Sequence, residues 1–245
     1  MLVLSIETST PRSSVCLARR DGPVAAAGLN VGQRHGEFVA PAIDFCLRQA
    51  GLEVHAINGV AVGIGPGLYT GLRAGMALAR TFAAARHLPV VGLCGLDVLA
   101  FDVRHVRRLI CAAIDARRGE LFWAFYRCAP GGVQRTSELR LGTPRKLAAE
   151  IEGLGEECLV IGDGAVRYAE VLGSEDTALG GLETAWPDAA HLAELAIPRF
   201  LREDTLRPDE LEPIYLRVAD ARIGWEGRGR VRGGRGEASG AAETG

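Results

Sequence analysis

The sequence lacks the long apolar segments and the basic leader that mark membrane and secreted proteins. Its 245 residues contain no run of about 18 uncharged apolar residues, and the N-terminus MLVLSIETST has neither a basic segment nor a small-residue cleavage site. Lysine is almost missing, because Lys146 is the only lysine among 28 lysines and arginines. The formal net charge of −2 gives the chain no global electrostatic basis for binding nucleic acid unaided. These features predict a soluble, cytoplasmic protein without membrane association.

Common catalytic and metal-binding motifs are missing as well. The sequence contains no C-x-x-C, H-E-x-x-H or G-x-S-x-G pattern, and no cysteine has a histidine at zinc-binding spacing. The cysteines are therefore expected to be buried free thiols in a reducing compartment: Cys16, Cys46, Cys94, Cys111, Cys128 and Cys158. The histidines are isolated from one another and are expected to be ordinary surface or core residues: His35, His55, His87, His105 and His191.

What the sequence does contain is an alternation of strand and helix patterns. At 48% hydrophobic residues the chain can bury a core in one or two domains. Short apolar or alternating segments predict strands at 2–7, 14–19, 23–30 and 59–63, with a further strand starting at Val90. Apolar residues at spacings of three and four predict helices at 36–50 and 71–86. This succession indicates a mixed α/β layer fold.

A second block of alternating patterns starts near residue 103. The segments 109–114 and 120–126 flank DARRG and predict a hairpin. Helices are expected at TPRKLAAEIEGL and GAVRYAEVLG, on either side of a strand at 158–162. A last helix at 188–202 is expected to begin at an Asp188 cap and to bend or break at Pro198.

The expected domain organisation follows from these patterns. The N-terminal subdomain covers 1–102 and is completed by a C-terminal segment near 190–217, while a smaller α/β subdomain covers 103–189. From Arg222 onward the chain is rich in glycine and arginine and has little to bury. This composition predicts a disordered tail over 222–245.

Two loops contain candidate binding residues. Glu7, Thr8 and Ser9 end the first strand with an acid and hydroxyls that could face a phosphate or a metal-bound water, although such clusters are also ordinary turn formers. The loop 65–71 leads into a helix N-terminus, where unpaired amides attract anions, but its glycines would equally allow tight packing of strand against helix. The candidate nucleotide or anion loop thus consists of Glu7, Thr8, Ser9, Gly65, Gly67 and Thr70.

The helix at 71–86 is apolar around most of its circumference. Gly71, Gly75 and Ala79 form a stripe of small residues at spacings of four. A helix of this kind must be covered on more than one side. The sequence leaves open whether the cover comes from this chain or from a partner.

The segment GIGPGLYTGLRAG resembles the GPGSFTGLR signature of the TsaB (YeaZ) family. Further segments similar to family motifs are LSIETST near the N-terminus, His35-Gly36-Glu37, Pro89-Val90-Val91-Gly92 with Leu96 and Ala100, Asp115 to Glu120, and Pro213-Ile214-Tyr215-Leu216-Arg217. The resemblance spans residue 1 to about 217. Departures are Glu7 where the family usually has Asp, Leu68 where it has Ser, and Tyr69 where it has Phe.

The resemblance implies an ASKHA (actin-like ATPase) fold and a scaffolding function. The family is a non-catalytic paralogue of TsaD, the subunit that transfers the threonylcarbamoyl group to the adenosine next to the anticodon of tRNAs reading codons that start with A. It further implies a ternary complex with the TsaE ATPase, a homodimer through the same surface when the chain is alone, and tRNA binding only via the complex. No cofactor is expected on this chain, whereas ATP or ADP and a divalent metal are expected on partner subunits. Gly95 and Leu99 stand where TsaD-like chains carry a metal-binding His-x-x-x-His pair.

By the same resemblance, the helices at 36–50 and 71–86 are expected to form the contact with TsaD. The expected interface residues are Phe38, Val39, Ile43, Leu72, Gly75, Met76, Ala79 and Phe82. Two alternatives remain open: an enzyme of this fold, either a glycoprotease-like peptidase or a nucleotide hydrolase, and an RNA-binding role of the tail. The tail arginines set among glycines are Arg222, Arg228, Arg230, Arg232 and Arg235.

Overall fold

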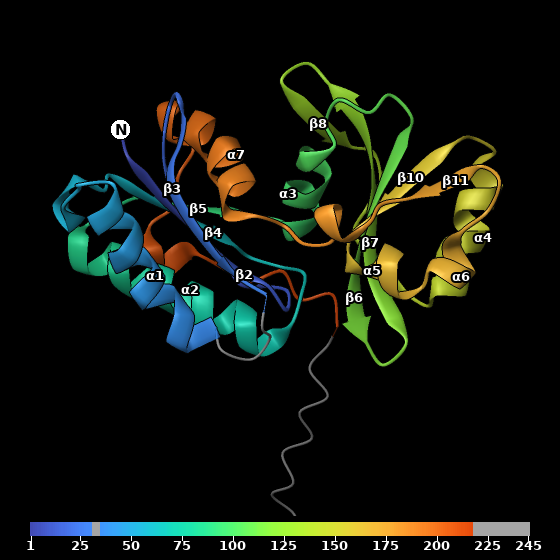
Figure 1. The fold of residues 1–245 in the computed structure, drawn as a ribbon, viewed down its shortest axis with the longest axis horizontal. Coiled ribbons are helices and arrows are strands. Elements are labelled where there is room, and N and C mark those ends of the chain that lie inside the picture. The colour runs from blue at the N-terminus through green and yellow to red at the C-terminus, as the bar shows by residue number, and fades with distance from the viewer. Residues whose placement is uncertain (31–34, 218–245) are drawn as a thin grey trace, which may run out of the picture.

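Two mixed sheets with the same strand order form the framework of the protein, seen as two lobes in the computed structural model (Figure 1). The structure describes residues 1–30 and 35–217, so the tail predicted at 222–245 lies outside the described residues. The first sheet has the order β3-β2-β1-β4-β5 and the second has the order β11-β10-β6-β7-β8, with β9 paired to β7. Read from β8, the second sheet runs β8-β7-β6-β10-β11, which repeats the order of the first.

The strand directions repeat as well. In each lobe the first strand pairs antiparallel with the second and parallel with a later strand, as β1 does with β2 and β4, and β6 with β7 and β10. The strands of the first sheet are β1 Val3–Glu7, β2 Ser13–Arg19, β3 Gly22–Leu29, β4 Gly59–Gly63 and β5 Val90–Leu93. Those of the second are β6 Leu109–Arg117, β7 Glu120–Ala129, β8 Gly132–Arg135, β9 Arg140–Gly142, β10 Cys158–Ile161 and β11 Thr177–Leu179.

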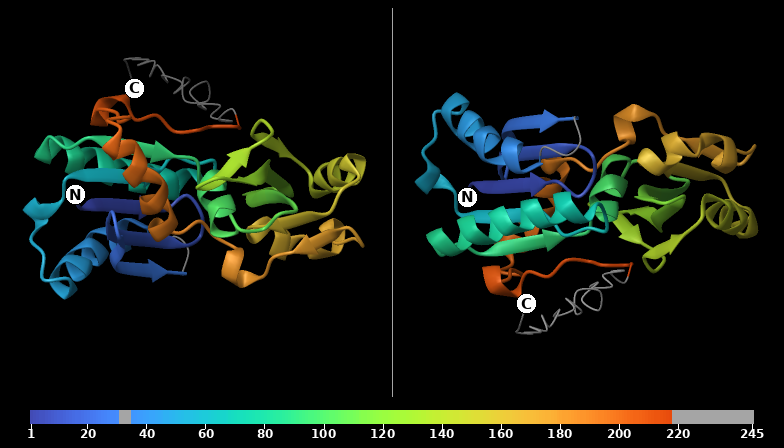
Figure 2. Two further views of the ribbon diagram at one scale, coloured as in Figure 1. Left: turned by 90° about the horizontal axis from the view of Figure 1, so that it is seen from above. Right: turned by 90° about the horizontal axis from the view of Figure 1, so that it is seen from below.

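Helices cover both faces of the first sheet. Because side chains alternate along a strand, Leu4 and Ile6 of β1 point to one face and Val3 to the other. Leu4 and Ile6 pack in one core with α1 (His35–Gln49) and α2 (Tyr69–Arg86). Val3 packs in another core with α7 (Ala189–Leu201). Figure 2 shows α7 crossing the sheet in one view and the α1–α2 pair lying on the opposite face in the other.

The second sheet is covered in the same manner. On one face α3 (Gly95–Asp102) packs against β6 and β7, and on the other lie α4 (Pro144–Leu154), α5 (Asp163–Arg167) and α6 (Ala169–Leu172). Short 3-10 turns complete the fold: η1 Val54–Ala56, η2 Leu182–Thr184 and η3 Pro208–Glu210. Among the helices of residues 1–30 and 35–217, none combines the length and the apolarity that crossing a membrane requires.

The chain returns to the first lobe after building the second. Besides α7, which contacts all five strands of the first sheet, Leu206 pairs with Val90 at the edge of β5. Farther on, the Ile214 N–H donates to the Ile64 carbonyl at 2.8 Å. The described chain passes between the lobes before α3, again before α7, and once more near residue 214, where Ile214 and Leu216 pack against the second-lobe core.

Pro198 is expected to bend or break the last helix, and it does not break α7, which continues to Leu201 because Ile197 and Phe200 pack against the sheet and hold the last turn in place. One expectation about a helix is wrong. The segment GAVRYAEVLG forms two short helices instead of one, since the backbone at Tyr168 leaves the helical region (φ −115, ψ 29). The hairpin expected around DARRG and the Asp188 cap are both confirmed.

Candidate functional site

The residues after β1 form a fully buried turn. Glu7, Thr8 and Ser9 are each at most 1% exposed. The Ser9 N–H donates to Glu7 Oε1 at 2.7 Å, and Thr8 Oγ1 donates to the Gly71 carbonyl at 2.8 Å. Burial raises the pKa of Glu7, and the hydrogen bond from the Ser9 N–H opposes the shift. The turn is thus held by its own backbone and by the start of α2.

The glycine-rich loop packs directly onto this turn. A Cβ atom at Gly63, Gly67, Gly71 or Gly75 would lie less than 3.0 Å from an atom of Glu7, Thr8 or Ser9, closer than Cβ atoms come in proteins. The Leu68 N–H also donates to the Ser9 carbonyl at 2.7 Å. Of the two uses that the sequence left open for these glycines, the geometry favours close packing of α2 against β1.

The predicted binding loop is therefore only partly assembled as a site. Glu7, Thr8, Ser9, Gly65 and Gly67 come together, whereas Thr70 is exposed on the first turn of α2. Glu7 Oε2 and Ser9 Oγ are buried and have no hydrogen-bond partner among residues 1–30 and 35–217. A Cβ atom at Gly95, the first residue of α3, would lie 3.3 Å from Ser9 Oγ, and the Gly95 N–H donates to the Gly65 carbonyl at 2.8 Å. The start of α3 thus closes the turn from the side of the second lobe.

A serine–histidine pair lies beside the turn, and the sequence did not reveal it. Ser13 Oγ and His35 Nδ1 are 2.6 Å apart, the separation of a nucleophile and its base. However, the two residues are only 3% and 5% exposed, and burial lowers the pKa of His35. In the described part of the chain, this buried contact links β2 to the start of α1.

Most of the residues expected at a partner interface are buried within the chain itself. Six of the eight are buried in the first lobe: Val39, Ile43, Leu72, Gly75, Met76 and Ala79. Phe38 and Phe82 are half-buried and pack at the margin of the same core. The stripe formed by Gly71, Gly75 and Ala79 faces this chain's own sheet, which is one of the two alternatives that the sequence left open.

The outer face of the α1–α2 pair carries exposed aromatic residues. Phe45 is 50% exposed and lines an apolar groove of about 460 Å³ between α1 and β3, together with Phe38 and Pro41. At the start of α2, Tyr69 is 51% exposed, and the Arg73 guanidinium lies 4.2 Å from the centre of its ring. Tyr215 adds a third ring, 5.9 Å from Tyr69. We use the name α1–α2 outer face for the exposed residues of both helices, which include Phe45 on the β3 side of α1 and Tyr69 at the start of α2.

The second lobe has a buried carboxylate at the end of its own first strand. Asp115 is 3% exposed, and its Oδ1 accepts a hydrogen bond from the Arg117 N–H at 3.0 Å. Its Oδ2 lies 3.2 Å from Arg117 Nη1 and 3.6 Å from Arg167 Nε of α5. Behind it, Asp163 Oδ1 accepts from the Asp115 N–H at 2.8 Å, and burial raises the pKa of Asp163 to about 6. Two carboxyl groups and two guanidinium groups thus meet at this end of the sheet.

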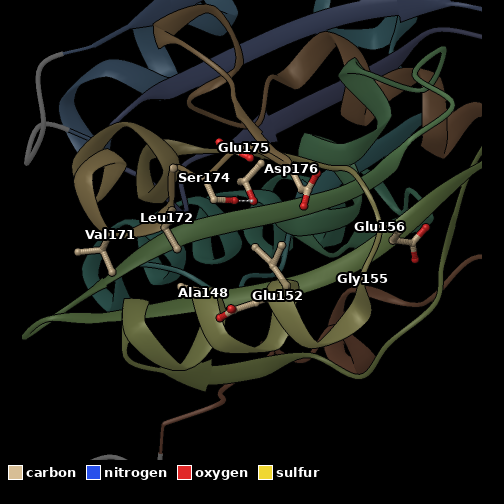
Figure 3. A pocket seen from close by; sticks show the side chains of 12 residues that line it. Ala148, Glu152, Gly155, Glu156, Val171, Leu172, Ser174, Glu175 and Asp176 are labelled. Atoms are coloured by element: carbon tan, nitrogen blue, oxygen red, sulfur yellow. Dashed lines mark hydrogen bonds between the residues drawn. The ribbon is translucent and has the colours of Figure 1, made fainter.

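A cavity of about 430 Å³ lies at the opposite end of the second lobe. Its lining includes the buried apolar residues Ile151 and Leu172. The exposed carboxylates Glu152, Glu175 and Asp176 also line it (Figure 3). None of the residues singled out in the sequence lines it. In the described part of the chain, no group of three or more histidine, cysteine or carboxylate side chains is arranged to hold a metal ion.

The sequence of the chain is similar to a described protein family and to several known proteins. Residues 30–225 match the family model described as TsaD, tRNA N6-adenosine threonylcarbamoyltransferase. The chain is 29% identical to the tRNA threonylcarbamoyladenosine biosynthesis protein TsaB of Escherichia coli, over 89% of this chain and 95% of that protein. It is 38% identical to the uncharacterised protein Rv3421c of Mycobacterium tuberculosis, over 90% of this chain and 93% of that protein.

A solved structure agrees with the sequence relatives. The chain is similar to YeaZ from Pseudomonas aeruginosa, with a TM-score of 0.78, 25% sequence identity, and coverage of 88% of this chain and 99% of that one. The expected fold class, an actin-like α/β fold of two mixed sheets with flanking helices, is confirmed. The chain belongs to the TsaB (YeaZ) family, within the wider family that the TsaD model describes.

Proposed function

We propose that this chain is a non-catalytic subunit in the biosynthesis of threonylcarbamoyladenosine in tRNA, where it binds and supports a catalytic TsaD partner. The observation that carries the proposal is the relationship to TsaB of Escherichia coli, which extends over 89% of this chain and 95% of that protein. The packing of the glycine-rich loop supports it. Gly67 and Gly71 lie against Ser9 and Thr8 and leave no room between α2 and β1, so this loop serves as framework.

The α1–α2 outer face is the proposed contact with TsaD. Of the expected interface residues, Phe38 and Phe82 reach this surface, and Phe45 and Tyr69 add the exposed aromatic area that interfaces favour. The six buried members of the expected set act indirectly, by holding the two helices against the sheet. Gly75 is no probe of this surface, because any side chain there would collide with Thr8.

The rest of the proposed assembly follows from the same role. An exposed apolar surface of this kind also supports a symmetric homodimer when the partner is missing. TsaE would join as a third subunit, tRNA would bind through the complex, and ATP or ADP and the divalent metal would be held by the partners. This chain requires no cofactor in the proposal, and its location is the cytoplasm.

Binding measurements with matched variants test the interface. Phe45→Asp and Tyr69→Asp place a charge on the α1–α2 outer face, whereas Leu182→Asp places one on an equally accessible apolar residue of the second lobe, 66% exposed. Against the TsaD of the same organism, the first two variants are expected to bind at least about 10-fold more weakly, since a buried unpaired charge is costly. Leu182→Asp is expected to bind as the wild type does. Unchanged TsaD binding by Phe45→Asp and Tyr69→Asp, with weaker binding by Leu182→Asp, would show that the α1–α2 outer face is not the contact.

A second assay addresses the proposed reaction. Cells that carry only the Phe45→Asp/Tyr69→Asp chain are expected to contain less threonylcarbamoyladenosine in their tRNA than cells with Leu182→Asp. Unchanged levels in cells lacking the chain altogether would contradict the proposed function. Turnover of ATP or of a peptide by the purified chain, lost in Glu7→Ala, would instead favour an enzyme.

A further inference from the structure

The last described residues form a strap that joins the two lobes, seen in Figure 2 as the final stretch of the coloured ribbon. We define this C-terminal strap as residues 211–217. Leu211 at its start is buried in the core of the first lobe. Ile214 packs against the core of the second lobe, and Arg217 forms an ion pair with Glu120 of β7. The strap is therefore held in place by both lobes.

Between these anchors, Tyr215 contacts the start of α2. Arg73 Nε donates to the Tyr215 hydroxyl at 3.3 Å, and the rings of Tyr215 and Tyr69 lie 5.9 Å apart. The Arg73 guanidinium also lies 4.2 Å from the centre of the Tyr69 ring, within the range of a cation–π contact. Both tyrosines are about half exposed. We call these three residues the Tyr–Arg–Tyr cluster.

Arg73 has no acidic partner in the described part of the chain. The interactions of its side chain there are the contacts with the two tyrosines, and α2 contains no aspartate or glutamate. Because Nε donates to Tyr215, the N–H donors of both Nη atoms are left without an acceptor among residues 1–30 and 35–217. The start of α2 thus presents an exposed positive charge that no ion pair within the described residues neutralises.

The cluster is arranged to receive a carboxylate. Two parallel N–H donors of a guanidinium match the two oxygens of a carboxylate, which makes such hydrogen bonds short and strong. The Tyr215 hydroxyl accepts from Arg73 and keeps its own proton to donate. The Tyr69 ring and the Tyr215 hydroxyl hold the guanidinium in one orientation, so little side-chain freedom remains to be lost on binding.

The surroundings of the cluster favour a protein partner over a small ligand or RNA. None of the three residues lines either of the cavities described above, whereas small ligands are usually enclosed. RNA binding by charge requires several phosphate contacts, and the cluster offers a single cation. Tyrosine and arginine are among the residues most enriched at the centres of protein interfaces. Tyr69 and Arg73 also belong to the exposed surface of α2, on the α1–α2 outer face.

We infer that Arg73 and Tyr215 together bind a carboxylate group of the TsaD partner, while Tyr69 holds the guanidinium in place. The inference rests on the proposed function, which puts TsaD on the α1–α2 outer face. It extends that surface to the C-terminal strap and assigns an aspartate or glutamate side chain of TsaD to the cluster. Because the strap is held by both lobes, this contact connects the partner to the second lobe as well as to α2.

The test measures TsaD binding by two variants at several salt concentrations. Arg73→Gln removes the charge and is expected to bind about 10-fold more weakly at low salt. Its affinity should also depend less on salt than that of the wild type, because one charge pair is lost. Tyr215→Phe keeps the ring, loses the hydroxyl and is expected to bind about threefold more weakly. The double variant should lose less than the product of the two single losses, since both groups bind one carboxylate.

Two control variants remove the same groups elsewhere on the chain. Arg202→Gln lies at the end of α7, on the face of the first sheet opposite α2 (Figure 2). Tyr168→Phe lies between α5 and α6 in the second lobe. Both controls are expected to bind TsaD as the wild type does. Thermal unfolding of every variant checks that the fold is retained, as expected for the exposed side chains of Arg73 and Tyr215.

Several outcomes would overturn the inference. Unchanged TsaD affinity of Arg73→Gln would do so, as would a loss of the same size at low and high salt, which would indicate a contact without a charge pair. Weaker tRNA binding by the complex at unchanged TsaD affinity would identify a stacking site for RNA bases instead. Failure of the wild-type chain to bind TsaD rejects the proposed function. TsaD binding that Phe45→Asp weakens and Arg73→Gln does not rejects only the carboxylate contact.

Discussion

The Glu7 carboxylate occupies the space in which a side chain at Gly63 would lie. A Cβ atom at Gly63 would come within 3.0 Å of both Oε1 and Oε2 of Glu7. Both residues are fully enclosed, one at the end of β1 and the other at the end of β4, so neither can turn toward solvent. The parallel pairing of these two strands therefore depends on a glycine at this position.

Gly63→Ala is expected to destabilise the protein by about 3 kcal/mol or more, because the methyl group must displace a buried carboxylate. Urea unfolding would measure the change. The matched control is Gly153→Ala on α4, where a Cβ atom meets nothing within 4 Å and alanine should stabilise by about 0.5–1 kcal/mol. A Gly63→Ala variant as stable as the wild type would contradict the packing described here.

Asp163→Asn is expected to change how stability depends on pH. Burial raises the pKa of Asp163 from 3.8 to about 6, so the native state holds this proton more tightly than the unfolded state does. The contribution of Asp163 to stability is therefore highest at low pH and falls as pH rises from about 4 to 6. Asparagine keeps an oxygen acceptor for the Asp115 N–H and removes the titration. The free energy of unfolding of the variant should therefore rise relative to that of the wild type as pH increases across this window, by up to about 3 kcal/mol. Urea unfolding at a series of pH values would measure this difference. A difference that stays constant with pH would contradict the prediction.

Two substitutions at Asp188 separate its helix cap from its ion pair. Its Oδ1 accepts from the Ala190 N–H at 2.8 Å, and its Oδ2 lies 2.7 Å from Arg12 Nη2. Asp188→Asn keeps the cap and loses the charge, whereas Asp188→Ala loses both. We expect alanine to cost about 1 kcal/mol more than asparagine in thermal or urea unfolding. Equal losses would mean that the cap contributes nothing.

Thiol labelling should distinguish one cysteine from the other five. All six are free, and Cys128 is the exposed one. Burial raises the pKa of Cys16, Cys94 and Cys158 to about 12, which leaves little thiolate near pH 8. A thiol reagent at that pH is expected to modify one cysteine in the native protein and six in denaturant. The folded Cys128→Ser variant should show no fast reaction with the reagent. Rapid labelling of more than one thiol in the folded wild-type protein would contradict the burial of the other five cysteines.

Local signals allowed the main helices and the central hairpin to be predicted. The helix expected at 71–86 occurs at 69–86, and the hairpin around DARRG has the expected strands. Both depend on residues close in sequence, through periodicity, capping and turn chemistry. By contrast, β9 and β11 have three residues each, and α3 is apolar on nearly every side. Such elements are defined by distant partners, so periodicity gives them no signal.

The candidate site shows the same limit. The sequence indicated that the glycines at 65–71 permit close approach, but not that Glu7, Thr8 and Ser9 would fill the space. It also could not assign the faces of α2, because a helix apolar around its circumference presents the same pattern to its own sheet and to a partner. The pairing of Asp115 with Arg167 was hidden for another reason, since 52 residues separate them and only the parallel β6–β10 register brings them together.

The late return of α7 has a consequence for synthesis on the ribosome. The N-terminal sheet receives its second covering layer only from residues 189–201, after the whole second lobe has been translated. Until then Val3, Ala61 and Val91 lack the α7 side chains that complete their core, in which α3 contributes Val98. Nascent chains of this protein should accordingly expose an apolar sheet face for most of elongation. We expect a ribosome-bound chaperone to bind them during that time.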